Sequence, residues 1–424
     1  MTLLRIVDAE GLLQSLDSLT EFDDQLSGIV SKIISRVRNH GDQALLDYTL
    51  EFDKVQLKNI RVDRQDLIKA HESVDSRIRQ ILQNAIRNIK HFHEHQKQES
   101  WTRSYGDGTI LGEKVTPLDR VGIYTPGGKA FYPSTIIMNA IPAQIAGVKS
   151  IAVASPPGPE GLPHPLVLAI CYLLGLEEVI AVGGAQIIAA LSYGTDSIDP
   201  VCKVTGPGNK FVAEAKRQVF GKVGIDSIAG PSEIVILHND SDVPAEYLAR
   251  DLLTQAEHDE DARAILITTL PETAAEVQSR IDQLVPGLPR KEIIMKSLQS
   301  NGCIVVVDTI EKGIQLVNKI APEHLELMVK DRTILDKINN AGAIFIGKWS
   351  SETIGDYFAG PNHTIPTSGA AKYGSPLSVR DFQKHSSLIE YSKQRLQKEA
   401  DDIAEFADLE GLNAHAEAIR VRQQ

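Results

Sequence analysis

The sequence predicts an α/β protein with two parallel sheets and with helical segments at both ends of the chain. Short apolar runs alternate with amphipathic stretches from about residue 121 to 232, and the same alternation starts again near residue 232 and continues to about 346. Strands that alternate with helices pair in parallel, because each helix returns the chain to the edge where the previous strand began. The segments before and after these two alternations show helical periodicity alone.

The N-terminal part, from about residue 20 to 100, is predicted to be helical. Its apolar side chains recur at helical spacing in two stripes, which are Leu26, Ile29, Val30, Ile33 and Ile34, then Leu67, Ile78, Ile81, Leu82 and Ile86. The segment ends in His91-Phe-His-Glu-His95. On a helix only His91 and His95 share a face, and no carboxylate or cysteine cluster follows at ligand spacing. We expect a solvated helix end here rather than a metal site.

Each alternation predicts its own set of strands. The strands expected in the first are 121–124, 150–154, 178–182 and 201–204, with helices at roughly 133–148, 164–175, 185–194 and 209–221. The strands expected in the second are 232–237, 264–268, 303–307 and 343–346. Runs of this length and composition are typical of strands that are buried on both faces of a parallel sheet.

We expect the first alternation to be inserted into the second. The predicted parts are an N-terminal helical segment leading into the first α/β domain (1–120), an inserted α/β domain (121–232), the first domain continued (233–380) and a C-terminal helical tail (381–424). The tail has only an interrupted apolar stripe, made of Leu396, Ile403, Phe406 and Leu409. Such a tail cannot bury enough surface to fold alone, so we expect it to dock on its own body or on a partner subunit.

Composition and charge exclude several classes of protein. The 424 residues are 42% hydrophobic and 24% charged, which is ordinary for a globular protein of two to four domains. The formal net charge of -12 disfavours a nucleic-acid or anionic-membrane surface. The N-terminus lacks a signal-peptide pattern, and the apolar run 166–176 is too short to span a bilayer, so we expect a cytoplasmic small-molecule enzyme.

The cysteines give no sign of a disulfide framework or of a thiolate zinc site. Cys171, Cys202 and Cys303 stand singly in apolar surroundings, without Cys-x-x-Cys spacing. We expect all three to be buried packing residues.

The chain is organised around residues 251–258, Asp-Leu-Leu-Thr-Gln-Ala-Glu-His. An apolar stripe of helical spacing leaves Gln255 and His258 as neighbours at i and i+3, so both side chains point the same way. An imidazole is a good ligand for a borderline metal, and an amide oxygen is a weaker one that suits an open site. A helix end with a capping histidine before an acidic turn remains the alternative.

Four Gly/Pro turns elsewhere carry polar side chains, as expected for loops at the rim of a site. They are Gly206-Pro-Gly-Asn209, Gly230-Pro-Ser-Glu233, Ala321-Pro-Glu-His324 and Gly360-Pro-Asn-His363. The first does not complete the Gly-x-Gly-x-x-Gly fingerprint of a Rossmann dinucleotide site, because Asn209-Lys-Phe211 follows it. The amide groups of a helix beginning there could still bind phosphate, and a simple strand-ending turn is the alternative.

Glu323 and His324 are a candidate acid/base pair. Neighbours on a regular element point apart, but an Ala-Pro turn can let both reach one cavity from different sides. A carboxylate and an imidazole near an alcohol or a water are the minimum for removing a proton before a hydride leaves. A surface glutamate with a capping histidine is the alternative.

These blocks, from about residue 20 to 420, resemble the histidinol dehydrogenase family. The resemblance implies two incomplete Rossmann-like domains, the inserted one binding NAD⁺, and a homodimer whose C-terminal segment completes the neighbour's site around one Zn²⁺ per subunit. It implies oxidation of L-histidinol through an aldehyde to L-histidine, with two NAD⁺ reduced. No nucleic acid or membrane partner is expected.

The resemblance also implies a role for each matching residue. Glu323 would activate water and His324 would act as acid/base. The implied zinc ligands are Gln255, His258, Asp356 and His415. The implied substrate contacts are Ser232, Gln255, His258, His324, Asp356, His363, Glu410 and His415. The implied NAD⁺ contacts are Tyr124, Gln186 and Asn209. All these motif positions are intact.

Two other functions use the same residues. A zinc hydrolase acting on a small amine or amide would employ the same ligands, with Glu323 beside a metal-bound water. A non-catalytic metal- and nucleotide-binding protein would keep the architecture without turnover. NADH absorbance separates them, because the hydrolase forms product without NADH and the binding protein is stabilised by ligands without forming product.

Overall fold

A six-stranded parallel sheet forms the first α/β unit in this computed structural model, which describes residues 2–17, 24–127, 132–228 and 230–423. The strand order is β1-β11-β10-β9-β12-β13, and every pair in it is parallel. The strands are β1 (Arg5–Val7), β9 (Glu233–His238), β10 (Arg263–Thr268), β11 (Cys303–Val306), β12 (His324–Met328) and β13 (Ala343–Ile346).

Helices cover both faces of this sheet, which is why its central strands are buried along their length. The side chains of β9 alternate between two hydrophobic cores. Those of Ile234 and Ile236 pack on one face of the sheet, and those of Val235 and Leu237 pack on the other. The helices on the first face are α9 (Ala245–Ala256), α10 (Pro271–Leu284) and α11 (Lys291–Asn301). Those on the second are α1 (Ala9–Asp17) and α12 (Ile310–Ile320). A short helix, α13 (Glu352–Tyr357), follows β13.

The second α/β unit is built on a five-stranded parallel sheet of order β6-β5-β4-β7-β8. Its strands are β4 (Arg120–Tyr124), β5 (Ser150–Ala154), β6 (Glu178–Ile180), β7 (Lys203–Thr205) and β8 (Gly224–Ile225). Its connecting helices are α5 (Pro133–Ala146), α6 (Pro165–Leu173), α7 (Gly184–Tyr193) and α8 (Lys210–Val219). The expected α/β class with two parallel sheets is therefore confirmed.

The N-terminal helices belong to this second unit. They are α2 (Asp24–Phe52), kinked at Gly41, α3 (Arg64–Ser73) and α4 (Ser76–Glu94). Apolar residues of α2 share a core with α7 and α8, and those of α3 and α4 share one with α5 and α6. We predicted from the sequence that these helices belong to the six-stranded unit, but only β1 and α1 join that unit. The prediction differs from the structure because an apolar stripe on a helix does not indicate which sheet the helix covers.

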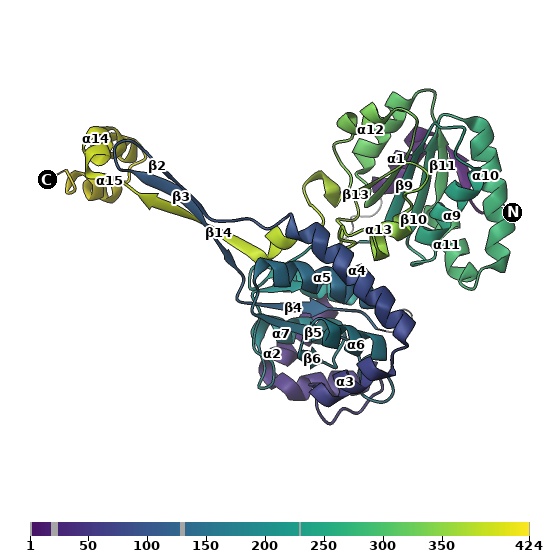
Figure 1. Ribbon diagram of the computed structural model, residues 1–424, viewed down its shortest axis with the longest axis horizontal. Helices are drawn as coiled ribbons and strands as arrows, with labels where there is room; N and C mark the ends of the chain where they lie inside the picture. Colours follow the sequence, from purple (N-terminus) through teal and green to yellow (C-terminus); the bar gives the residue numbers. More distant parts are fainter. Residues whose placement is uncertain (1, 18–23, 128–131, 229, 424) are drawn as a thin grey trace.

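A three-stranded antiparallel sheet forms an arm that projects from the body (Figure 1). Its order is β14-β3-β2, with β2 (Trp101–Ser104), β3 (Ile110–Pro117) and β14 (Gln383–Glu390). The arm ends in α14 (Lys393–Leu409) and α15 (Asn413–Arg420), which lie away from both parallel sheets. The tail is helical from residue 393, but it begins with a strand that the sequence did not predict.

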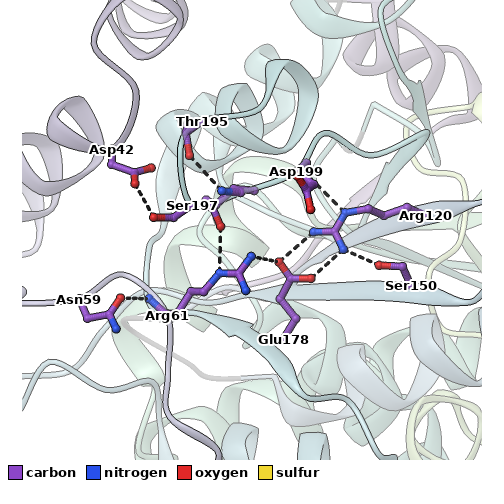
Figure 2. A network of polar contacts seen from close by, with 10 residues as sticks. Asp42, Asn59, Arg61, Arg120, Ser150, Glu178, Thr195, Ser197 and Asp199 are labelled. Atoms are coloured by element: carbon purple, nitrogen blue, oxygen red, sulfur yellow. Dashed lines mark hydrogen bonds and ion pairs between the residues drawn. The ribbon is translucent and has the colours of Figure 1, made fainter.

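A network of polar contacts joins the strands of the five-stranded sheet where they begin (Figure 2). The guanidinium of Arg120 donates to both carboxylate oxygens of Glu178, at 2.7 and 2.8 Å. It also donates to the Ser150 hydroxyl, and Arg61 reaches Glu178 at 3.1 Å. The network joins three strands and the N-terminal helical segment through paired, charge-assisted hydrogen bonds, so we assign it to stability.

The cysteines and the histidines near residue 93 differ in their burial. Cys171 and Cys303 are buried as expected, but Cys202 is exposed, because it precedes the strand β7 instead of lying within it. His91 and His95 are exposed at the end of α4, whereas His93 is buried and contacts Gln96. Among the described residues, no helix has the length and apolar character needed to cross a membrane.

Candidate active site

The candidate site lies where the amino edge of the six-stranded sheet meets the unit built on the five-stranded sheet. His324 and Glu233 are the first residues of β12 and β9. The loop after α13 contacts the start of α5, where the Nε2 atom of His363 lies 3.1 Å from the Ser134 hydroxyl. Two more contacts join these parts, because the Asn362 amide donates to a carbonyl of α5 and the amide of Asn139 reaches the side chain of Thr364.

The end of α9 supplies Gln255 and His258. Leu252, Leu253 and Ala256 anchor the helix in the core of the six-stranded unit, which fixes the direction of the opposite face. The Gln255 side chain is fully buried, and the amide N–H of His258 donates to the Gln255 carbonyl in the turn that ends the helix. The apolar stripe identified in the sequence therefore sets the position of both side chains.

His324 is held as a neutral imidazole. Its Nδ1 atom lies 3.2 Å from the carbonyl oxygen of Glu233, which can only accept, so the proton sits on Nδ1. Burial lowers the pKa of His324 to about 3. The remaining atom, Nε2, has its lone pair free, is buried without a hydrogen-bond partner, and lies 3.8 Å from an oxygen of Asp356. This is the arrangement of a general base.

Glu323 lies next to His324 at the same edge. Ala321 adopts a left-handed conformation (φ 55°) that ends α12 and leads the chain into β12. The Glu323 carboxylate accepts the N–H of Glu233 at 2.9 Å and lies 3.6 Å from Nδ1 of His324. The side chain of Ser232 is also within its hydrogen-bonding reach. The two adjacent residues thus meet in one site. Burial raises the pKa of Glu323 well above its usual range, and this makes the ionised form a stronger base.

Side chains with oxygen and nitrogen atoms that could bind a metal ion converge beside this pair. One ligand atom each of His258, Glu352 and Asp356 lies within 4.8 Å of the other two. Burial raises the pKa of Asp356 to about 7 and that of Glu352 well above its usual range. Several buried acids in one place repel each other when ionised, and a bound cation relieves that repulsion. The donor set, an imidazole with carboxylates, fits Zn²⁺.

Sequence reasoning did not find Glu352. It is the first residue of the short helix α13, where a glutamate is ordinarily interpreted as a charge that favours the helix N-terminus. Nothing in the local pattern shows that its side chain is buried. The same holds for Glu326, fully buried within β12, whose carboxylate accepts the N–H of Glu352 at 2.9 Å.

The residues expected to contact a nucleotide lie at the carboxyl edge of the five-stranded sheet. Tyr124 ends β4, and its buried hydroxyl accepts the N–H of Gly184 at 3.4 Å. Gln186, in the first turn of α7, is buried with Oε1 unpaired. Asn209 caps α8 by accepting two backbone N–H groups. A Cβ atom on Gly206 would lie 1.9 Å from the Tyr124 carbonyl, so only glycine allows this close approach. An unpaired buried amide beside glycine turns fits a polar ligand such as NAD⁺.

The structure brings together seven of the expected site residues and leaves two apart. The seven are Ser232, Gln255, His258, Glu323, His324, Asp356 and His363. Glu410 and His415 lie on the arm, in the turn after α14 and in α15, away from both parallel sheets (Figure 1). Within one chain, the expected fourth zinc ligand is therefore absent from the site.

Comparisons with known proteins match the whole chain. A sequence profile of histidinol dehydrogenase matches residues 17–423. The histidinol dehydrogenase of Halalkalibacterium halodurans is 49% identical over 423 residues, covering 100% of this chain and 99% of that protein. The enzyme of Bacillus subtilis is 47% identical, covering 97% and 96%. The crystal structure of histidinol dehydrogenase from Elizabethkingia anophelis has a TM-score of 0.94 at 34% identity and covers 100% of this chain and 98% of that one. This chain belongs to the histidinol dehydrogenase family.

Proposed function

We propose that this protein oxidises L-histidinol through L-histidinaldehyde to L-histidine and that two NAD⁺ are reduced in succession. Each oxidation transfers one hydride to NAD⁺, and the second also consumes one water. The observation that carries this proposal is the free Nε2 atom of His324, which lies 3.8 Å from Asp356, one of the proposed metal ligands. A neutral base at this point would accept the proton of the alcohol group of a substrate whose nitrogens are bound by the metal.

The proposed zinc ligands from this chain are Gln255, His258 and Asp356. Zn²⁺ would bind the imidazole and amine nitrogens of the substrate, and its main contribution would be to fix the orientation of the substrate. His363, which contacts the Ser134 hydroxyl, and Ser232, which lies beside Glu323, belong to the same site and are proposed substrate contacts.

His324 and Glu323 divide the proton transfers between them. In the first oxidation, Nε2 of His324 takes the proton of the alcohol while Nδ1 keeps its contact with the Glu233 carbonyl. In the second, Glu323 takes a proton from the water that adds to the aldehyde, which gives the hydrate that loses the next hydride. The Glu233 N–H and the Ser232 side chain hold the Glu323 carboxylate in place for this step.

The proposed nucleotide site is the carboxyl edge of the five-stranded sheet, with Tyr124, Gln186 and Asn209 as contacts. This edge favours a dehydrogenase over a hydrolase, because a hydrolase has no use for a second ligand site facing the acid/base pair. The unpaired Oε1 of Gln186 and the amide nitrogen of Asn209, whose oxygen is already used in the helix cap, are the free polar atoms offered there.

We also propose a homodimer in which Glu410 and His415 complete the partner's site. The arm holds these residues away from their own body, and its helices leave large apolar side chains exposed, including Phe406 and Leu409. Such side chains favour burial against another molecule. In this arrangement His415 is the fourth zinc ligand and Glu410 a substrate contact.

NADH absorbance with L-histidinol tests the proposed activity. We expect NADH to form, to stop after zinc is removed by a chelator, and to return when Zn²⁺ is added. Two NADH per L-histidine are expected. Conversion of a small amide without NADH would instead indicate a zinc hydrolase, and thermal stabilisation by histidinol or NAD⁺ without any product would indicate a binding protein.

A further inference from the structure

The buried amide of Gln255 has to be turned in one particular direction to bind a metal. A glutamine amide carries one oxygen, which can coordinate a cation, and one NH₂ group, which cannot. The two ends are nearly equal in size, so packing alone does not choose between them. The hydrogen-bond partners around the amide must make that choice.

Glu352 provides acceptors for the NH₂ end. With Nε2 of Gln255 on the side of Glu352, it donates to the two carboxylate oxygens at 3.0 and 3.2 Å. A bound cation beside Glu352 favours its ionised form. In the reversed orientation, the Gln255 oxygen would then face the oxygens of the ionised carboxylate directly, and a buried contact of that kind is unfavourable. The same Gln255 nitrogen also lies 3.2 Å from Nδ1 of His324. Because Nδ1 donates its proton to the Glu233 carbonyl, no hydrogen bond forms between these two nitrogens, and the two Glu352 oxygens decide the orientation of the amide.

The Glu352 carboxylate is itself held in place. The residue is 1% exposed and begins α13, and its own N–H donates to the carboxylate of Glu326 at 2.9 Å. Glu326 is fully buried in β12. Because Glu352, Glu326 and Gln255 are all buried, the Glu352 side chain is enclosed by protein and does not turn toward solvent.

We infer that Glu352 is a positioning residue: it binds the NH₂ group of Gln255 and so turns the amide oxygen toward the metal site of His258 and Asp356. This inference rests on the proposed function, because the metal is part of it. Direct coordination by Glu352, whose oxygen lies within 4.8 Å of ligand atoms of the other two residues, is the competing interpretation. Both of its oxygens, however, are within hydrogen-bonding distance of the Gln255 nitrogen.

Zn²⁺ affinity of the metal-depleted full-length protein, measured by competition with a chromophoric chelator, tests the inference. Glu352→Gln should weaken Zn²⁺ binding by about 10- to 100-fold, the usual effect of losing a partner that orients a ligand. Glu352→Asp keeps the charge but withdraws the oxygens by one CH₂ group, and it should weaken binding similarly. The control Asp251→Asn removes an acid of the same buried cluster, and it should change affinity by less than about 3-fold.

A double-mutant cycle separates positioning from direct coordination. If Glu352 acts through Gln255, then Gln255→Ala with Glu352→Gln should bind Zn²⁺ within about 3-fold of Gln255→Ala alone. Additive losses, or unchanged affinity in both Glu352 variants, would overturn the inference. If Glu352→Gln fails to fold, by circular dichroism, the same cycle with Glu352→Asp decides. Failure of the unmodified protein to bind Zn²⁺ would instead refute the metal in the proposed function.

Discussion

Replacing Asp251 with asparagine should stabilise the metal-free protein at neutral pH. Asp251 lies on α9 beside Glu326, and burial raises the pKa of Asp251 from its ordinary value of 3.8 to about 6. A difference of about 2 between folded and unfolded pKa corresponds to about 3 kcal/mol once both pKa values are exceeded. An acid with a raised pKa binds more protons in the folded state, so its penalty is absent below pH ~4, grows between pH ~4 and 6, and is complete at pH 7.5.

Calorimetric unfolding in a chelator at pH 5 and pH 7.5 measures this effect. Asp251→Asn should unfold at a higher temperature than the unmodified protein at pH 7.5, by roughly 2–4 °C for each kcal/mol, and the difference should shrink at pH 5. The neutral amide introduced by this substitution would still accept a hydrogen bond from protonated Glu326. Glu276→Gln, which removes an exposed carboxylate on α10, is the control and should leave the pH dependence unchanged. A variant that is less stable than the original at pH 7.5 would refute the reasoning.

Three further changes have distinct expected results. Glu323→Gln should slow aldehyde oxidation by about 10²- to 10⁴-fold and slow alcohol oxidation far less, when the two NADH-forming steps are measured separately. Equal losses in both steps would assign water activation to another residue. His258→Asn should weaken Zn²⁺ binding by at least ~100-fold yet leave NAD⁺ affinity, followed by fluorescence, nearly unchanged, and full activity without zinc would contradict its role as ligand. Arg120→Met should lower the free energy of unfolding by about 2 kcal/mol, because it breaks the paired hydrogen bonds to Glu178. Loss of the exposed ion pair of Arg64 should change the free energy of unfolding little. Equal effects of the two variants on the thermal midpoint would contradict this expectation.

Eight strands of the two parallel sheets could be predicted because they are short apolar runs between turns, whereas β1, β8 and β12 were not predicted. The strand β12 was missed because Ala321-Pro322 before it indicates a turn. The turn does occur, but the strand begins directly after it. The arm could not be predicted either. β14 pairs with β3, which lies far away in the sequence, and both strands lack the alternation that burial of one face would impose.

Within the candidate site, the sequence indicated the residues that stand in an unusual local sequence, and it did not indicate those whose neighbours in the sequence are ordinary. Glu323 and His324 stand in a Gly/Pro-type turn, and Gln255 and His258 follow an apolar helical stripe, so each attracts attention. Glu352 and Glu326 differ from surface glutamates only through their burial, which depends on how β12, α9 and α13 pack together. That packing is decided by contacts between distant parts of the chain.

Mixing two inactive variants tests most directly that the proposed dehydrogenase site is shared between two chains. His258→Asn and His415→Asn chains are each expected to be inactive alone, and they are unfolded and refolded together. If His415 acts in the partner's site, each mixed dimer contains one site with both lesions and one with neither, so NADH formation from L-histidinol should return to about a quarter of the unmodified level. If all ligands came from one chain, every site would keep a lesion, and a mixture as inactive as its parents would contradict the account.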